Sequence, residues 1–285
     1  MKRLIYILLS AITFPSIADN AVPTAYLKAQ YNAWHSISKE NGEKPSLKEE
    51  TYILQIGHGE SCYYNRQTYY VDSLINDPNG KLIYDQAWND ALQDFTNSGT
   101  NIFRTLEDKG LMGESSYKNK KSFKDNRIVV YDRNGDNYRY DVDMSDLSWE
   151  LCDSTAVVLN YECNLARADY HGRQWTAWFA PDIPVQDGPW QLCGLPGLVM
   201  KAETDDGAYG FVITGLQQCD EPFKVTEMDP NNLFITKRKS FLKMKDYRRR
   251  NRSSQIKAMT NGKVNVPESA NYKGKDDYLE TDYHD

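Results

Sequence analysis

The side chains that could do acid–base or metal chemistry are few and scattered. The sequence contains four histidines, at His35, His58, His171 and His284. No histidine pair has the spacing of a helical zinc site, and no HExxH motif occurs. His58 and Glu60 lie two residues apart and could share a metal, but a turn between two strands explains the pair better. We therefore expect no metal site and no cofactor.

Nucleophilic chemistry has one candidate residue type, cysteine. The chain has five cysteines, with no CxxC pair that would indicate a redox motif or a thiolate zinc site. In an oxidising compartment, one or two disulfides are expected instead. A cysteine nucleophile beside a histidine stays open as an alternative, with Cys193 in a Gly- and Pro-rich turn. No GxSxG elbow, P-loop or GxGxxG motif is present, and no catalytic residue is assigned.

One short stretch superficially resembles a calcium loop. Residues 132–136 read DRNGD, but the sixth and twelfth positions of such a loop are Asn137 and Asp143 rather than glycine and glutamate. The Asn134-Gly135 dipeptide favours a type I′ turn between two strands. The sequence therefore predicts a β-hairpin over residues 128–143.

The N-terminus predicts export. Lys2 and Arg3 precede an apolar run, and Ser16-Ile17-Ala18 supplies the small residues of a cleavage site, so residues 1–18 are expected to be a signal peptide. Losing those two basic residues from 34 leaves 32 against 40 acidic ones, a net charge of −8. This sign argues against a nucleic-acid partner. No later segment is apolar for long enough to span a membrane.

Strand and turn patterns dominate the rest of the chain. Short β-prone runs occur at 50–57, 60–65 and 155–180, and a second hairpin over 197–216 turns at Asp206-Gly207. The region 26–37 fits either a helix or a strand, and we favour a strand because its tyrosines, His35 and Ile37 fit an edge better than a core helix. Helical patterns are expected at 83–95, from Ala87, Ala91 and Phe95, and at 229–251, starting with Asp229-Pro230. These patterns predict an α+β, mainly β domain with a curved antiparallel sheet and one or two helices.

The domain organisation expected is simple. One β-rich domain spans residues 19–252, because no linker or internal repeat divides it. Residues 253–285 turn polar and are expected to be loosely packed or disordered.

The segment 177–202 is the most distinctive part of the sequence. It contains Gly194-Leu195-Pro196-Gly197-Leu198-Val199, preceded by WFAPDIP at 178–184 and GPW at 188–190. It resembles the GLPGLI family, secreted proteins of Bacteroidota named for this run. The resemblance implies a compartment and a fold but no catalytic residues. Ala168 stands where many members carry a second cysteine, five residues after Cys163, which puts a local disulfide there in doubt.

The physical role of this segment is expected to be rigid packing. Its prolines fix the backbone dihedral φ, and its glycines allow positive φ or close approach of the backbone. Its tryptophans and leucines supply apolar area. It could close the end of a curved sheet or form the lip of an apolar pocket. As lip residues we single out Trp178, Phe179, Trp190, Leu195, Pro196 and Leu198.

These observations favour an exported soluble binding or accessory protein of the bacterial cell envelope, in the periplasm or outside the cell. The ligand, lipid-like or a peptide, or an envelope partner would lie on the concave sheet face, as in lipoprotein-carrier folds, which the arrangement weakly resembles. Two alternatives stay open. One is an exported hydrolase with a cysteine or His/carboxylate site, and the other is a structural or adhesive envelope protein.

Overall fold

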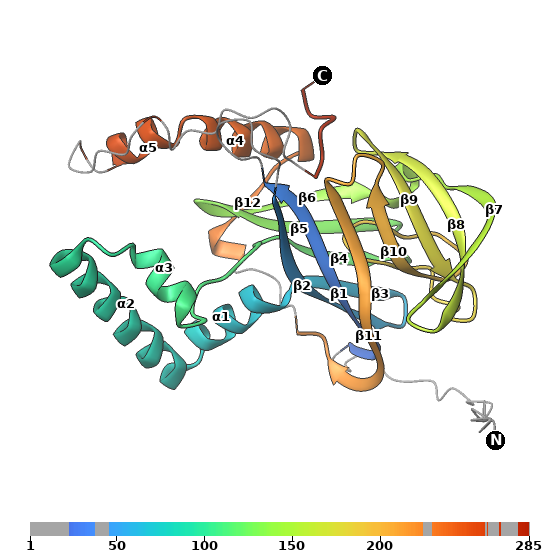
Figure 1. Ribbon diagram of the computed structural model, residues 1–285, viewed down its shortest axis with the longest axis horizontal. Helices are drawn as coiled ribbons and strands as arrows, with labels where there is room; N and C mark the ends of the chain where they lie inside the picture. The colour runs from blue at the N-terminus through green and yellow to red at the C-terminus, as the bar shows by residue number, and fades with distance from the viewer. Residues whose placement is uncertain are drawn as a thin grey trace.

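The computed structural model describes residues 23–37, 46–224, 230–259, 261, 268 and 279–284. The predicted signal peptide at residues 1–18 lies outside the described residues. Within them, one curved, open sheet of twelve strands forms the body of the molecule (Figure 1). The predicted mainly β fold is confirmed.

The sheet has two halves that meet at β1. One half continues from β2 to β6 and ends with β12, and the other runs from β11 to β7. The sheet order is β12-β6-β5-β4-β3-β2-β1-β11-β10-β9-β8-β7, and every neighbouring pair is antiparallel except β12 with β6. The strand bounds are β1 Thr24–Ile37, β2 Ser46–Gly57, β3 Glu60–Asn65, β4 Lys118–Ser122, β5 Arg127–Asn134, β6 Asp136–Asp143, β7 Glu150–Val158, β8 Tyr161–Tyr170, β9 Arg173–Ala180, β10 Leu198–Thr204, β11 Tyr209–Pro222 and β12 Leu233–Ile235.

Alternation along the central strands places one face in the core. In β1, Ala25, Leu27, Ala29, Tyr31 and Ala33 are buried while the residues between them are more exposed, the period of two that a half-buried strand requires. The small alanines let other parts of the chain approach this inner face closely. The core therefore lies on the concave side of the sheet.

Both predicted hairpins form, at Gly135 between β5 and β6 and at Asp206-Gly207 between β10 and β11. Gly135 has a φ of 85°, whereas Asn134 pairs with Asp136 as part of the ladder. A type I′ turn would need positive φ at both Asn134 and Gly135, so the hairpin is in the predicted place but its turn type differs.

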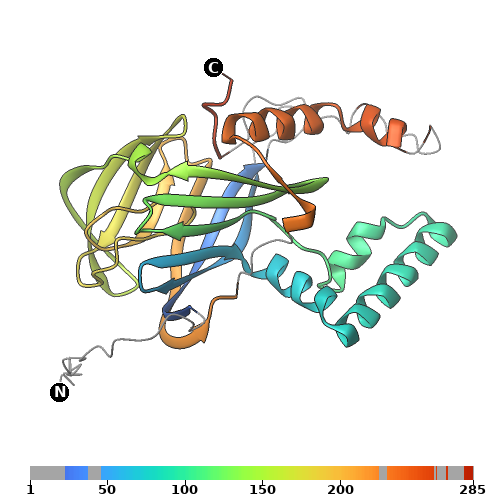
Figure 2. The ribbon, with the colours of Figure 1, turned by 180° about the vertical axis from the view of Figure 1, so that it is seen from behind.

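Five α-helices occur among the described residues, more than the one or two predicted. Helices α1 to α3 form a helical insertion between β3 and β4, and α4 and α5 follow β12. Their bounds are α1 Arg66–Asn76, α2 Pro78–Ser98, α3 Ile102–Asp108, α4 Arg238–Arg250 and α5 Arg252–Met259. The two helical groups project from the same side of the sheet (Figures 1 and 2).

The predicted helix starting at Asp229-Pro230 is wrong at its N-terminal end. Residues Pro230–Asn232 form a single 3₁₀ turn, and residues 233–235 form β12, which pairs in parallel with β6. Helix α4 begins eight residues later, at Arg238, with Phe241 and Leu242 buried against the sheet. Pairing with an exposed strand edge satisfies the backbone of this stretch, and the N-cap pattern cannot reveal that partner.

The C-terminal segment packs where it is described. Tyr283 is 1% exposed in the core beneath α4, and Glu280 is also buried. Thr281 donates its backbone N–H to the His171 carbonyl over 2.9 Å, and the Arg173 side chain donates to the Leu279 carbonyl over 3.1 Å. Residues 279–284 thus differ from the loose packing expected for residues 253–285.

No helix within the described ranges is both long enough and apolar enough to cross a membrane.

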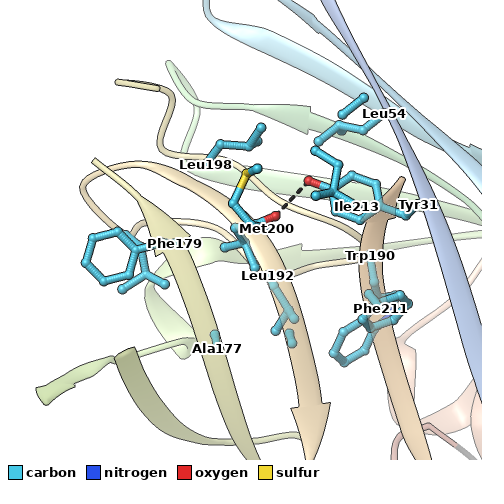
Figure 3. Packing of buried hydrophobic residues seen from close by; sticks show 14 of the residues in the cluster. Tyr31, Leu54, Ala177, Phe179, Trp190, Leu192, Leu198, Met200, Phe211 and Ile213 are labelled. Atoms are coloured by element: carbon cyan, nitrogen blue, oxygen red, sulfur yellow. Dashed lines mark hydrogen bonds between the residues drawn. The ribbon is translucent and has the colours of Figure 1, made fainter. Parts of the chain in front are cut away.

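The loop between β9 and β10, residues 181–197, covers the concave face of the sheet. Its Trp190, Leu192 and Leu195 are buried with Phe179 and Leu198 in the main core (Figure 3). Tyr31 in β1 donates its hydroxyl hydrogen to the Val199 carbonyl over 2.8 Å, shown by the dashed line. The loop is therefore joined to the sheet by apolar packing, and the buried hydrogen bond from Tyr31 fixes the start of β10 directly after the loop.

A buried ion pair holds the base of this loop. The Lys121 ammonium in β4 lies 2.5 Å from the Asp187 carboxylate, and both side chains are 0% exposed. The same ammonium donates to the Gly188 carbonyl over 2.7 Å, and the Asp187 carboxylate accepts from the Gly188 backbone N–H over 2.7 Å. A buried charge pair of this kind needs these additional hydrogen bonds because desolvation is costly.

Candidate functional site

A cavity of about 340 Å³ lies between the inner face of the sheet and helix α4. Strands β1, β2, β5, β6 and β11 form one side, and α4 with the C-terminal segment forms the other. The lining residues are Ala33, Trp34, His35, Glu50, Tyr52, Glu114, Ser115, Ser116, Tyr117, Val130, Asp132, Arg133, Tyr140, Trp190, Tyr209, Phe211, Leu242, Lys245, Leu279 and Glu280. We call this cavity the concave-face pocket.

Aromatic rings form much of the pocket wall. The Trp34 indole is not part of this wall, because Trp34 pairs with Gly210 and alternates with the inward-facing Ala33 and His35, so its ring lies over Gly210 on the outer face of the sheet. The His35 and Tyr209 rings stack with centroids 6.3 Å apart. Trp190 packs against Trp175 at 5.5 Å. Three elements far apart in the sequence therefore bring flat aromatic surfaces to one cavity.

Trp190 has an unusual backbone. Its φ is +52°, in the left-handed region that bulky residues rarely adopt and that costs about 1–2 kcal/mol. The neighbouring Gln191 side chain anchors the conformation, because its carbonyl oxygen accepts from the Tyr170 hydroxyl over 3.1 Å and lies 3.1 Å from His171 Nε2. Strain of this kind persists only where the surroundings hold it, and it concentrates at functional sites.

Two largely buried side chains bring unused polar atoms to the pocket. Tyr140 is 3% exposed and Trp190 is 2% exposed. Among the described residues, no hydrogen bond is made by the Tyr140 hydroxyl or by the Trp190 indole N–H, although both residues line the cavity. Buried polar groups normally have partners, so these are available to a ligand or to water.

The Glu50 carboxylate is held by its own protein. Its Oε2 accepts from the Tyr52 hydroxyl over 2.8 Å and from the Ser115 hydroxyl over 2.6 Å, and its Oε1 lies 2.9 Å from the Lys48 ammonium. Burial, which alone would raise the pKa of Glu50, is outweighed by these bonds, and the pKa lies below its ordinary value. Glu50 is therefore ionised and structurally engaged rather than poised as a proton donor.

Most other charges around the pocket are also paired. The Lys245 ammonium lies 2.6 Å from the buried Asp132 carboxylate, which also accepts from the Ser116 hydroxyl. The Arg133 guanidinium makes two hydrogen bonds to Asp72, of 3.0 and 2.9 Å. Glu114 is the exception among the lining carboxylates of the described chain, since it accepts from the Asn65 amide over 2.9 Å but has no cationic partner.

A second polar cluster lies where the C-terminal segment meets the β8–β9 turn. One ligand atom each of His171, Glu280 and Asp282 lies within 4.8 Å of the others, a grouping that a metal ion could use. The Arg238 guanidinium, however, forms ion pairs with both Glu280 and Asp282. The arrangement fits an arginine clasp that fastens α4 and the C-terminal segment together, because the guanidinium takes the place a cation would need.

The predicted behaviour of this clasp with pH follows from His171. Burial lowers the pKa of His171 and Arg238 adds to this, together outweighing Glu280 and Asp282, which act to raise it. Since the unfolded chain then binds the proton more readily, stability is expected to be full above about pH 6.5 and to fall as the pH drops through the folded-state pKa. Asp282, whose pKa is also lowered, acts in a separate window below about pH 3.8.

Urea unfolding at pH 7.5 and 5.0 measures this contribution. The His171→Asn variant, which keeps a residue tolerant of the φ of +52° found here, is expected to lose less stability than the parent on acidification. The exposed His58→Asn variant should follow the parent. An unchanged pH dependence in His171→Asn would contradict the assignment.

The residues predicted to form the pocket lip have different placements. Trp190 lines the concave-face pocket, whereas Phe179 and Leu198 are enclosed in the core and Trp178 packs half-buried against it. Leu195 and Pro196 line a separate cavity of about 490 Å³ beside Trp149 and Cys193. The structure therefore brings one of the six to the concave-face pocket.

The pocket residues that sequence reasoning missed come from ordinary-looking strands. His35, Glu50 and Tyr140 lie in β1, β2 and β6, and Lys245 lies in α4. The alternating pattern could have shown that Tyr138 and Tyr140 share one face of β6. Asp132, considered only as part of a calcium-loop resemblance, is 3% exposed and faces Lys245. The pair His58 and Glu60 belongs to no three-residue cluster of metal ligands in the part of the chain searched.

The expectation of disulfides is wrong. All five cysteines are free thiols in the structure. Burial raises the pKa of Cys62 to about 12 and that of Cys193 to about 11. No cysteine has a histidine as a hydrogen-bond partner among the described residues; Cys163, for example, donates to the Tyr161 carbonyl.

Alkylation checks the thiols directly. After denaturation without reductant, iodoacetamide is expected to modify all five cysteines, counted by intact mass. In the native protein, the partly exposed Cys152 and Cys219 should react first, because Cys62, Cys163 and Cys193 are buried and their pKa values are raised. Fewer than five modifications in the denatured, unreduced protein would reveal a disulfide.

Comparison with known proteins finds one family model that matches part of this region. Residues 167–201 match the family described as "Protein of unknown function (Porph_ging)". The matched stretch contains β9, the 181–197 loop and the strained Trp190. The GLPGLI assignment itself stays a prediction.

No curated protein matches the chain. Among solved structures, two with the titles "Structure of PNGF-II in P21 space group" and "Structure of PNGF-II in C2 space group" are similar, each at 13% identity, with TM-scores of 0.47 and 0.45. Each covers 79% of this chain, whereas the chain spans about a third of their length, 34% and 33%.

Proposed function

We propose that this protein is an exported binding protein of the bacterial cell envelope and that its ligand occupies the concave-face pocket. Export is supported by the basic, apolar and small-residue pattern of residues 1–18. Binding is supported by a cavity of about 340 Å³, which lies at the lower end of the volumes typical of small-molecule sites.

One observation carries the proposal: Trp190 is buried, backbone-strained and faces the pocket with an unused indole N–H. A tryptophan that served packing alone would gain nothing from a positive φ. Its position depends on Gln191, Tyr170 and the buried Lys121–Asp187 pair at the base of the loop. The 181–197 loop therefore acts as a rigid mount for one wall of the site.

The residues that line the pocket favour a different class of ligand from the lipid that an apolar sheet face would bind. The apolar residues of the concave side are largely covered by the 181–197 loop, and the remaining cavity is lined by aromatic rings together with Glu50, Asp132 and Lys245. An acyl chain in contact with these charges would desolvate them without compensation. A small ligand with polar groups fits this lining better than a lipid tail.

The binding function is preferred over hydrolysis on the chemistry of the site. No thiol lies beside a histidine as a hydrogen-bond partner in the described chain, and Glu50 is ionised and fully engaged. A general acid or base needs a free proton or lone pair directed at the substrate. The pocket supplies donors and ring surfaces, which suit recognition.

Native mass spectrometry tests the proposal. The full chain is exported to a bacterial periplasm through its own N-terminus and purified gently, and a noncovalent species of defined mass is expected to accompany it. The His35→Ala variant, which removes a ring that stacks on Tyr209 in the pocket wall, should lose that species, while Trp88→Ala, in the helical insertion, should retain it. A protein without any adduct, or an adduct retained in His35→Ala, would contradict the proposal.

A further inference from the structure

We infer that the concave-face pocket takes a neutral, polyhydroxylated ligand, a sugar ring being the simplest case. This inference rests on the proposed binding function and specifies the chemistry of its ligand. It follows from the charge state of the lining, the position of the pocket in the sheet and the kinds of groups left unpartnered.

Charge pairing disfavours an ionic ligand. Three lining carboxylates already have cations of the protein: Glu50 has Lys48, Asp132 has Lys245 and Glu280 has Arg238. The lining Arg133 is likewise paired, with Asp72. An anionic ligand would have to break one of these pairs or enter without a counter-charge, and both are costly. A cationic ligand would meet one unpaired lining carboxylate in the described chain, Glu114, which already accepts from the Asn65 amide.

The place of the pocket disfavours an extended peptide. Peptides that bind β-sheet proteins commonly add a strand to an exposed edge. The free edges of this sheet are β12 and β7, whereas the pocket lies over β1, β2 and β11 in the interior of the sheet, where both neighbours of each strand are present. Main-chain pairing is therefore not offered to a ligand here.

The unpartnered groups suit hydroxyls and C–H faces. The Tyr140 hydroxyl can donate and accept, the indole N–H group of Trp190 donates, and the Glu114 carboxylate accepts. The electron-rich faces of indole and phenol rings attract weakly positive C–H groups. A sugar ring presents both features at once, with hydroxyls around its edge and C–H bonds on its face.

The indole N–H resonances of a uniformly ¹⁵N-labelled full-length protein test the inference. The probes are methyl β-glucoside, methyl α-mannoside, N-acetylglucosamine and cellobiose, compared with choline, phosphate and the neutral peptide N-acetyl-trialanine amide. At least one sugar is expected to shift the Trp190 signal saturably and to leave that of Trp88, in the helical insertion, unchanged.

Variants separate contact from folding. Tyr140→Phe removes one hydroxyl and is expected to weaken sugar binding about 3- to 10-fold, whereas Tyr247→Phe, on the exposed side of α4, should bind like the parent. Shifts from choline, phosphate or the peptide with none from any sugar would overturn the ligand class but leave the binding function standing. If no sugar produces a shift, the ligand class also fails, and the mass-spectrometric experiment decides the binding function separately.

Discussion

Replacing Lys121 with alanine is expected to lower the free energy of unfolding by about 3–5 kcal/mol. Lys121 and Asp187 are both completely buried, so the variant leaves a carboxylate without its cation in the interior. It also removes the donor for the Gly188 carbonyl. A loss of this size is a large share of the roughly 5–15 kcal/mol that stabilises an ordinary domain.

The neighbouring lysine supplies the control. Lys120 lies in the same strand but is 34% exposed and 3.8 Å from Glu60, so Lys120→Ala should cost well under 1 kcal/mol. The double variant Lys121→Met with Asp187→Leu should recover part of the loss, because no charge stays buried. Chemical denaturation measures all three variants. Equal costs for Lys121→Ala and Lys120→Ala would show that the pair does not hold the loop.

Replacing Trp190 is expected to destabilise the protein, and glycine should be a less damaging replacement than alanine. Trp190→Ala should cost about 3–5 kcal/mol, because the buried ring packs on Trp175 and Tyr170. Trp190→Gly should cost less than Trp190→Ala, since glycine adopts the φ of +52° without the penalty that alanine retains. At an ordinary strand position, glycine is the worse of the two replacements.

Trp178 provides the matched comparison. It lies in the regular strand β9, where the structure gives no positive φ, so Trp178→Gly should be less stable than Trp178→Ala. Thermal or urea unfolding of the four variants measures whether alanine or glycine is the more stable replacement at each of the two positions. If glycine were also the worse replacement at position 190, the backbone strain assigned to the pocket wall would be wrong.

The hairpins were predictable because their signals are local. Glycine at positions 135 and 207 allows the positive φ values of 85° and 66° that these turns need, and β-prone residues flank both turns. The strand favoured for residues 26–37 is confirmed by β1. In the helix predicted at 83–95, Ala87 and Ala91 are buried as expected, whereas Phe95 is 51% exposed.

Other elements depend on partners that the sequence does not show. Helix α1 begins directly at the end of β3, where Asn65 caps it by accepting from the Thr68 backbone N–H. Strand β4 has the sequence KNKKS, a pattern typical of a solvated loop, yet Lys121 in its middle is fully buried. Only the distant Asp187, 66 residues along the chain, makes that burial tolerable.

Of the six lip residues singled out from the sequence, one lines the candidate site. Trp190, in the Gly- and Pro-rich loop over the concave face, is the lip residue that reaches the pocket. The remaining walls come from β1, β2, β6 and α4, whose side chains meet only when the sheet curves. Single-sequence periodicity gives the face on which a residue lies but not which strands meet across a cavity.

The most direct test of the account is a crystal structure of the protein purified from the periplasm, or soaked with the sugar that binds best. We expect ligand density in the concave-face pocket, in contact with the His35 and Trp190 rings and within hydrogen-bond distance of the Tyr140 hydroxyl. Ligand density elsewhere, such as the cavity beside Leu195 and Pro196, with the concave-face pocket holding only water, would contradict the proposal.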